Sequence, residues 1–254
     1  NIKYMGLRSI LKKKLYNFKN LRKKNSIVKG NLFLITGASS GIGLALTKKL
    51  VQNNKVVAVY NTNIDNLIKI NTSNLIKVKC DLSDFSNYED LEKKIEHYKI
   101  DIIINCAGQF GSHNQLIENI DFDNLIKVFK INSISILKIL QILSKKNTLK
   151  FLSKIINISS DGGSIKLNNQ GNAYIYRISK SALNSISKNL SIDLNKKYKS
   201  DIVTIDPGSV KSGMNDKGHL DADKCAEYII DIMCDKKNSF NGKFVNLLKK
   251  EIPW

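Results

Sequence analysis

The sequence predicts a doubly wound α/β fold: a Rossmann-type parallel sheet in a single domain. Short apolar runs rich in isoleucine and valine alternate with longer segments of helical periodicity, as in parallel sheets with helical crossovers. The length of 254 residues supplies a full core for one domain. The sequence shows no internal repeat or linker after residue 30. We therefore expect residues 30–254 to form one domain that includes the ligand pocket.

Seven apolar runs are the expected strands. Each is continuous in character, as in strands buried on both faces of a parallel sheet. They are Leu32–Ile35, Val56–Val59, Leu75–Val78, Ile102–Ile104, Ile155–Ile158, Ile202–Ile205 and Phe244–Leu247. Helices are expected between them, near residues 42–53, 84–98, 120–146, 174–198 and 222–235. Ligands of such sheets bind beyond the carboxyl ends of the strands, so the residues after each run are the candidates for function.

Residues 1–29 differ from the rest of the chain in charge. They hold ten lysines and arginines and no acid, whereas the remainder has 31 basic and 22 acidic residues. Leu7, Leu11, Leu15 and Phe18 recur at helical spacing, which predicts a basic amphipathic extension. Such a helix suits a membrane surface, a partner protein or organelle targeting, and it equally suits a helix packed on the core. A secretory signal is not expected, because no apolar region is followed by a small-residue cleavage site.

The formal net charge of +19 is weak evidence for nucleic-acid binding. Lysine supplies nearly all of it, and only three arginines are present, although arginine is the residue that binds bases and phosphates bidentately. We expect no specific nucleic-acid partner. Scattered cysteines favour reduced thiols in a cytoplasmic protein. Neither these cysteines nor the three histidines have metal-ligand spacing, so no metal is expected; the cysteines are Cys80, Cys106, Cys225 and Cys234.

A glycine-rich turn follows the first expected strand and opens a helix. Its glycines have the spacing G-x-x-x-G-x-G, which lets the backbone turn sharply and approach a ligand closely. The helix N-terminus offers free N–H groups and a partial positive charge to a pyrophosphate. The turn therefore predicts a dinucleotide site; a turn used only for packing is the alternative. The residues concerned are Gly37, Ser39, Ser40, Gly41, Ile42 and Gly43.

The order of the motifs is similar to that of the short-chain dehydrogenase/reductase family, from about residue 31 onward. The resemblance rests on the glycine turn and on Asp81, Asn105-Cys106-Ala107-Gly108, Asn132, Ser159-Ser160, Tyr176-x-x-x-Lys180 and Pro207-Gly208. Residues 159–165 and 174–184 and the final Glu251-Ile252-Pro253-Trp254 resemble the C-factor-like subgroup, which includes carbonyl reductases. The resemblance implies hydride transfer between NAD(P)(H) and a carbonyl or alcohol substrate. It also implies a homodimer or homotetramer.

The resemblance implies four catalytic residues: Asn132, Ser160, Tyr176 and Lys180. A free tyrosine has a pKa near ~10, which is too high for efficient proton transfer at neutral pH. Lys180 lies one helical turn after Tyr176, so we expect its cation to lower the pKa of Tyr176. Ser160 would bind the substrate oxygen, and Asn132 would support a water-mediated proton path to Lys180. The alternative is a nucleotide-binding regulatory or signalling module with little turnover.

NADP(H) is expected in preference to NAD(H). The segment Tyr60-Asn61-Thr62-Asn63 carries no acid at the place where NAD enzymes bind the ribose hydroxyls. The substrate pocket is expected to be formed by residues 109–113, the 161–173 loop and the segment after Pro207. The remaining expected cofactor contacts are Asn61, Asp81, Leu82, Asn105, Ala107, Gly108, Tyr176, Lys180, Pro207, Gly208, Val210 and Ser212.

Overall fold

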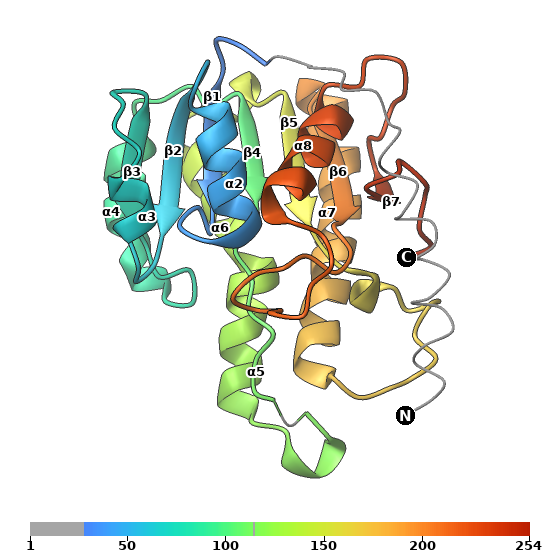
Figure 1. Cartoon of the computed structure of the whole chain (residues 1–254). Coiled ribbons are helices and arrows are strands. Elements are labelled where there is room, and N and C mark those ends of the chain that lie inside the picture. Colours follow the sequence, from blue (N-terminus) through green and yellow to red (C-terminus); the bar gives the residue numbers. More distant parts are fainter. Residues whose placement is uncertain (1–27, 114) are drawn as a thin grey trace.

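Seven parallel strands form the central sheet, in the order β3-β2-β1-β4-β5-β6-β7 (Figure 1). The computed structural model describes residues 28–113 and 115–254. The fold class and all seven expected strands are confirmed. Their bounds are β1 Leu32–Thr36, β2 Lys55–Tyr60, β3 Leu75–Lys79, β4 Ile102–Asn105, β5 Lys154–Ile158, β6 Asp201–Asp206 and β7 Lys243–Asn246. The basic extension expected at residues 1–29 falls almost entirely on residues 1–27, outside the described residues.

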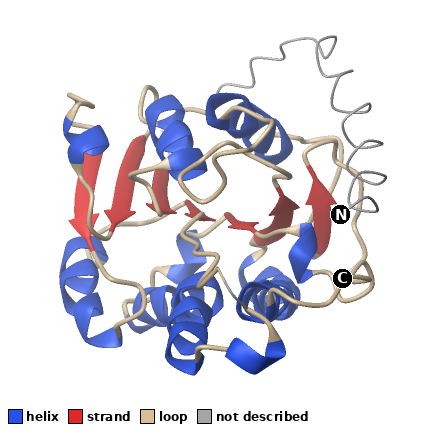
Figure 2. Ribbon diagram, turned by 60° about the horizontal axis from the view of Figure 1, so that its bottom comes forward, coloured by secondary structure: helices blue, strands red, loops and turns tan. Residues whose placement is uncertain are grey.

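Helices cover both faces of the sheet (Figure 2). Side chains alternate along each strand, so Phe33 and Ile35 enter one core and Leu34 enters the other. The first core is closed by α2 (Gly41–Leu50), the short α3 (Asp65–Ile68) and α8 (Ala222–Met233). The second is closed by α4 (Tyr88–Ile95), α6 (Ser135–Lys145) and α7 (Tyr174–Tyr198). Within the described residues, no helix has the length and apolar character needed to cross a bilayer.

The helix expected over residues 120–146 is interrupted by a π-helical turn (Lys130–Ile134). This turn separates α5 (Phe122–Phe129) from α6. Ser133 and Ser135 donate their hydroxyl protons to the backbone carbonyls four residues earlier, a contact that often bends helices. Single π turns commonly occur at functional sites. Here the turn contains Asn132, whose side chain is buried.

The strand ends lie side by side where the topology reverses. β1 and β4 are neighbours, and the chain extends from them toward opposite edges of the sheet. In register, Thr36 lies opposite Asn105, and Asn105 lies opposite Asn157. In Figure 1 the strands run downward, and α5 and the loops after β5 and β6 lie beyond their lower ends. This is the end of an α/β sheet at which ligands bind.

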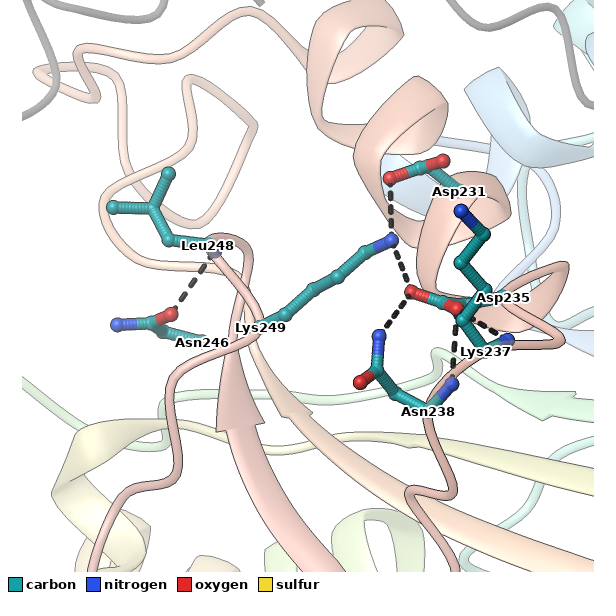
Figure 3. A network of polar contacts seen from close by, with 7 residues as sticks. All are labelled: Asp231, Asp235, Lys237, Asn238, Asn246, Leu248 and Lys249. Carbon is teal, nitrogen blue, oxygen red and sulfur yellow. Dashed lines mark hydrogen bonds and ion pairs between the residues drawn. The ribbon is translucent and has the colours of Figure 1, made fainter.

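A polar network holds the C-terminal turn against the end of α8 (Figure 3). The Nζ atom of Lys249 lies 2.8 Å from a carboxylate oxygen of Asp231 and 2.6 Å from one of Asp235. The hydrogen bond from Lys249, with others from Asn238 and Lys237, holds the pKa of Asp235 well below its usual range.

The C-terminal segment beyond this turn braces the loop after β5. The hydroxyl of Ser164 donates to the carbonyl of Pro253 at 2.6 Å, and the N–H of Lys166 donates to the carbonyl of Trp254 at 3.2 Å. The Trp254 ring stacks on Phe244 of β7, with ring centroids 5.5 Å apart. The last residues of the described chain therefore contact a loop of the expected substrate pocket.

We expect Lys249→Met to lower the free energy of unfolding by about 1 kcal/mol at neutral pH. The pKa of Asp235 is lowered in the folded protein, so its contribution is present above the pKa of the unfolded chain, near ~4. That contribution is lost as the pH falls. Urea unfolding at several pH values should show the two proteins converging in acid. The exposed neighbour Lys250→Met is the control, and equal destabilisation by both substitutions would contradict the prediction.

Candidate active site

The glycine turn after β1 packs directly against the turn after β4. Gly37 has a φ of +65°, and a Cβ atom there would lie 2.7 Å from the Cα of Ala107. A Cβ atom at Gly43 would overlap the carbonyl oxygen of Gly37. The side chain of Thr36 joins the two turns, because its Oγ1 accepts from the N–H groups of Cys106 and Ala107 at 3.1 and 3.2 Å. Packing against neighbouring backbone is therefore enough to require glycine at positions 37 and 43.

Gly41 is the glycine that faces open space. It begins α2 with a φ of +50°, and the nearest atom to an added Cβ would be the Cβ of Ser212, at 3.4 Å. Ser40, the N-cap residue, makes no side-chain hydrogen bond to the first N–H groups of α2. A helix N-terminus left open beside a close glycine backbone fits a pyrophosphate. The structure thus brings the expected residues 37–43 together with Ser212.

Two of the expected cofactor contacts, Asn61 and Asp81, meet beyond the ends of β2 and β3. The side chain of Asn61 hydrogen-bonds the carboxylate of Asp81, which also accepts from the N–H and hydroxyl of Ser83. Burial alone would raise the pKa of Asp81, but these hydrogen bonds hold it below its usual value. Leu82, also expected at the cofactor, is buried in the second core. The Leu82 side chain therefore packs in the core just after β3.

The remaining expected cofactor contacts lie at the ends of β4 and β6. Asn105 donates to the side chain of Asn157 at 2.6 Å, which ties β4 to β5. A Cβ atom on Gly108 would lie 3.5 Å from both Asn132 Oδ1 and Lys180 Nζ, so this glycine faces the space between them. Pro207 and Gly208 follow β6 at the same edge, whereas Val210 is buried in the first core.

Asn132 links three segments of the site. Its Oδ1 accepts from the N–H of Gln109 at 2.8 Å, and its Nδ2 donates to the carbonyl of Gln109 and the hydroxyl of Ser179, both at 2.9 Å. The loop after β4, the π turn and α7 are thereby joined. Lys180 is buried nearby, and its Nζ donates to the carbonyl of Ile158 at 2.8 Å. Burial lowers the pKa of Lys180 to about 8.

Tyr176 lies between Ser160 and Phe110. Its hydroxyl shares a hydrogen bond with Ser160, and its ring contacts that of Phe110, with centroids 5.1 Å apart. Ser160, and not Ser159, faces Tyr176, because the Ser159 hydroxyl is buried and donates to Asn184 at 2.7 Å. The four expected catalytic residues therefore lie around one end of the sheet.

The expected lowering of the Tyr176 pKa by Lys180 is wrong for this structure. Burial raises the pKa of Tyr176 to about 12; the hydrogen bond from Ser160 opposes the rise, and the carboxylates of Asp206 and Asp161 add to it. The Lys180 ammonium is itself desolvated and bonded to the Ile158 carbonyl, with its Nζ 5.8 Å from the Tyr176 ring centroid. Lys180 is thus near the tyrosine without being hydrogen-bonded to its oxygen.

Several residues of the site escape prediction from sequence. Gln115 is buried; its Oε1 accepts from the N–H of Tyr176 at 3.2 Å, and its Nε2 donates to the carbonyl of Phe110 at 3.0 Å. No sequence pattern marks this glutamine. Asp161 and Asp206, by contrast, adjoin predicted motifs, and their positions beside Ser160 and Pro207 are the signal that could have found them. In the described part of the chain, no group of histidine, cysteine or acidic side chains could hold a metal ion.

Comparison with known proteins identifies relatives. A family model described as short chain dehydrogenase matches residues 31–222. The chain is 30% identical over 185 residues to the probable short-chain type dehydrogenase/reductase VdlC of Helicobacter pylori, and this match covers 70% of the chain and 65% of that protein. The matched part thus spans slightly less than two thirds of VdlC. The chain is 27% identical over 158 residues to the C-signal protein of Myxococcus xanthus, a match that covers 61% of the chain and 93% of that protein.

Solved structures share the fold. The NADPH-bound carbonyl reductase from chicken fatty liver superposes with a TM-score of 0.77 and 26% sequence identity. The match covers 89% of this chain and 100% of that one. The predicted resemblance to C-factor-like proteins and carbonyl reductases is confirmed, because proteins of both kinds are among those similar to this chain.

Gly41→Val should abolish dinucleotide binding. A branched side chain at this left-handed position would strain the backbone and occupy the open side of the turn. Isothermal titration with NADPH and NADH measures the loss. Gly30→Val is the matched control, because Gly30 has a φ of +74° with no atom within 4 Å of an added Cβ. Wild-type affinity in Gly41→Val would place the pyrophosphate elsewhere.

Proposed function

The chain belongs to the short-chain dehydrogenase family, and on that basis we propose that it is an NADP(H)-preferring reductase of ketones or aldehydes. The observation that carries the proposal is the group formed by Ser160, Tyr176 and the buried Lys180 beside the open glycine turn. The turn is suited to the pyrophosphate of a dinucleotide. The group contains a proton donor and a cation at the same edge of the sheet. An oxidoreductase needs both features together.

When bound, a nicotinamide cofactor supplies or accepts the hydride. The oxygen of a carbonyl that gains a hydride must also gain a proton, and Tyr176 is the residue that donates it. A pKa of about 12 keeps Tyr176 protonated at neutral pH. Tyr176 thus holds the proton that carbonyl reduction needs, although its raised pKa makes it a weaker acid than a free tyrosine. Lys180 would hold the ribose of the cofactor, because its Nζ borders the space that Gly108 and Asn132 face.

The proposed preference for NADP(H) rests on two supports. The residues after β2, from Asn61 to Asn63, carry no acid that would repel a 2′-phosphate. The chicken carbonyl reductase, which shares the fold, holds NADPH. Asn61 would hydrogen-bond the ribose or its phosphate, and its contact with Asp81 fixes the orientation of the amide.

The proposal is tested with the pure protein, NADPH or NADH, and a panel of ketones and aldehydes. We expect oxidation of NADPH that depends on the carbonyl compound, with slower oxidation of NADH. The second candidate function is a nucleotide-binding module with little turnover. Tight NADPH binding without turnover of any compound would favour that module and contradict the proposal. A module would have no physical need for a buried lysine one helical turn after a half-buried tyrosine.

Tyr176→Phe should lower kcat by ~10²-fold or more, because it removes the proton donor and little packing. NADPH binding should persist. Lys180→Met should lower turnover and also weaken NADPH binding, since the lysine would hold the ribose as well. Tyr174→Phe, on the same helix and partly exposed, is the control and should retain activity. Near-normal turnover in Tyr176→Phe would refute the assignment of the donor.

Asn61→Asp should shift the kcat/KM ratio toward NADH. The new carboxylate would repel a 2′-phosphate and would also lie beside the Asp81 carboxylate. Asn63→Asp adds the same charge two residues away at an exposed position and serves as the control. An unchanged ratio in Asn61→Asp would show that the cofactor choice is made elsewhere.

A further inference from the structure

The helix that carries Tyr176 begins without a cap of its own. The N-cap residue of α7 is Ala173, which has no side-chain oxygen to accept from the N–H groups of the first turn. Arg177 donates to the carbonyl of Ala173 at 2.9 Å, so the N–H of Tyr176 belongs to the turn that precedes the first hydrogen bond within the helix. The proton donor of the proposed reaction therefore lies on a turn that would fray without an acceptor from another segment.

Gln115 supplies this acceptor from the loop after β4. The residue is 4% exposed, and its Oε1 accepts from the N–H of Tyr176 at 3.2 Å. Its Nε2 donates to the carbonyls of Phe110 and Ser112, at 3.0 and 2.8 Å. The amide oxygen thus has one partner and the amide nitrogen has two, which matches its two protons. A buried amide that is paired in this way holds its partners in one arrangement.

The same loop also contacts the ring of Tyr176. Phe110 packs against that ring, with centroids 5.1 Å apart. At the next residue, Gly111 has a φ of +92°, and a Cβ atom there would lie 2.9 Å from a side-chain carbon of Ile175. The loop therefore lies tightly against the first turn of α7. Gln115, Phe110 and Tyr176 form a closed set in which each residue contacts the other two.

We propose that Gln115 is a positioning residue for the proton donor: its side-chain amide caps the first turn of α7 and fixes Tyr176 to the loop that carries Phe110. This inference rests on the proposed function and adds a residue to it. Gln115 acts through the backbone of Tyr176. Without the amide, the first turn can move, and the Tyr176 hydroxyl moves with it. The glycine turn suited to the pyrophosphate lies on other elements and should be unaffected.

The chain offers a closely matched control for the loss of this amide. Gln115→Met removes the amide and keeps the length of the side chain. Asn54 is likewise 4% exposed and has the same pattern of bonds. Its Oδ1 accepts from the N–H of Asn31 at 3.1 Å, and its Nδ2 donates to the carbonyls of Val28 and Leu50 at 2.9 and 2.8 Å. Asn54 immediately precedes β2, at the end of the sheet opposite the site. Asn54→Leu should therefore lower stability without altering catalysis.

The first readout is carbonyl reduction at a temperature at which every variant is folded. In Gln115→Met we expect kcat to fall by ~10-fold or more, since misplacing a reacting group by about 1 Å can cost ~10²-fold. The affinity for NADPH should be retained. Asn54→Leu should keep the wild-type kcat, although it should unfold at a lower urea concentration than the wild type. A wild-type kcat in Gln115→Met, or an equal fall in both variants, would overturn the proposal.

The second readout is amide hydrogen exchange, which needs no turnover. NMR of protein with isotope-labelled tyrosine follows the Tyr176 amide, and Tyr176→Phe assigns its signal. In Gln115→Met this amide should exchange roughly tenfold faster than in the wild type, the effect of losing one hydrogen bond. In Asn54→Leu its exchange should be unchanged. Equal exchange in Gln115→Met and the wild type would overturn the proposal.

Two further outcomes are also decisive. If Gln115→Met does not fold, the wild-type protein is sufficient: the Tyr176 amide should exchange more slowly than that of Tyr174 at the start of the same turn, and equal rates would overturn the proposal. If the wild-type protein reduces no carbonyl compound, the proposed function fails. The exchange measurements then still decide whether Gln115 holds Tyr176 in place.

Discussion

Gly37 and Ala107 approach so closely that no Cβ atom fits between them, and the rest of the site depends on this contact. It holds the turn after β1 against the turn after β4, where the sheet topology reverses. The hydroxyl of Thr36 reinforces the contact with two hydrogen bonds across the same boundary. From there the loop after β4 leads to Gly108 and Gln109, and the π turn presents Asn132 to them. The glycine turn and the segment around Asn132 are therefore positioned through one close contact between backbones.

Burial is the second constraint, because it acts oppositely on the two central groups. It raises the pKa of Tyr176 and lowers that of Lys180, so each is driven toward its uncharged form. A tyrosine with a raised pKa keeps its proton at neutral pH but is a weaker acid than a free tyrosine. In the described structure the lysine is bonded to the carbonyl of Ile158, so the pair is not coupled directly. The carboxylates of Asp206 and Asp161 add to the rise in the Tyr176 pKa that burial causes.

The sequence predicts the fold well and the site in part, for physical reasons. Continuous apolar runs identify buried parallel strands, and glycine spacing identifies a turn that must approach other backbone. The break in the helix around Asn132 escapes prediction, because residues 120–146 keep a helical apolar pattern across the π turn. Contacts between distant segments, such as those of Gln115, leave no periodic signal. The pKa of Tyr176 is missed for another reason: spacing places Lys180 on the same helix face, but burial and the nearby carboxylates follow only from the tertiary structure.

Hydride transfer itself is the step that most directly tests this view of the protein. NADPH carrying deuterium at the transferable position can be incubated with the protein and a reducible ketone, and the alcohol product examined by mass spectrometry. We expect deuterium on the carbinol carbon of the product, and ~10²-fold less deuterated alcohol at an equal, short reaction time when Phe replaces Tyr176. Binding of the labelled NADPH without any labelled alcohol, across a broad set of carbonyl compounds, would contradict an oxidoreductase and leave a nucleotide-binding module in its place.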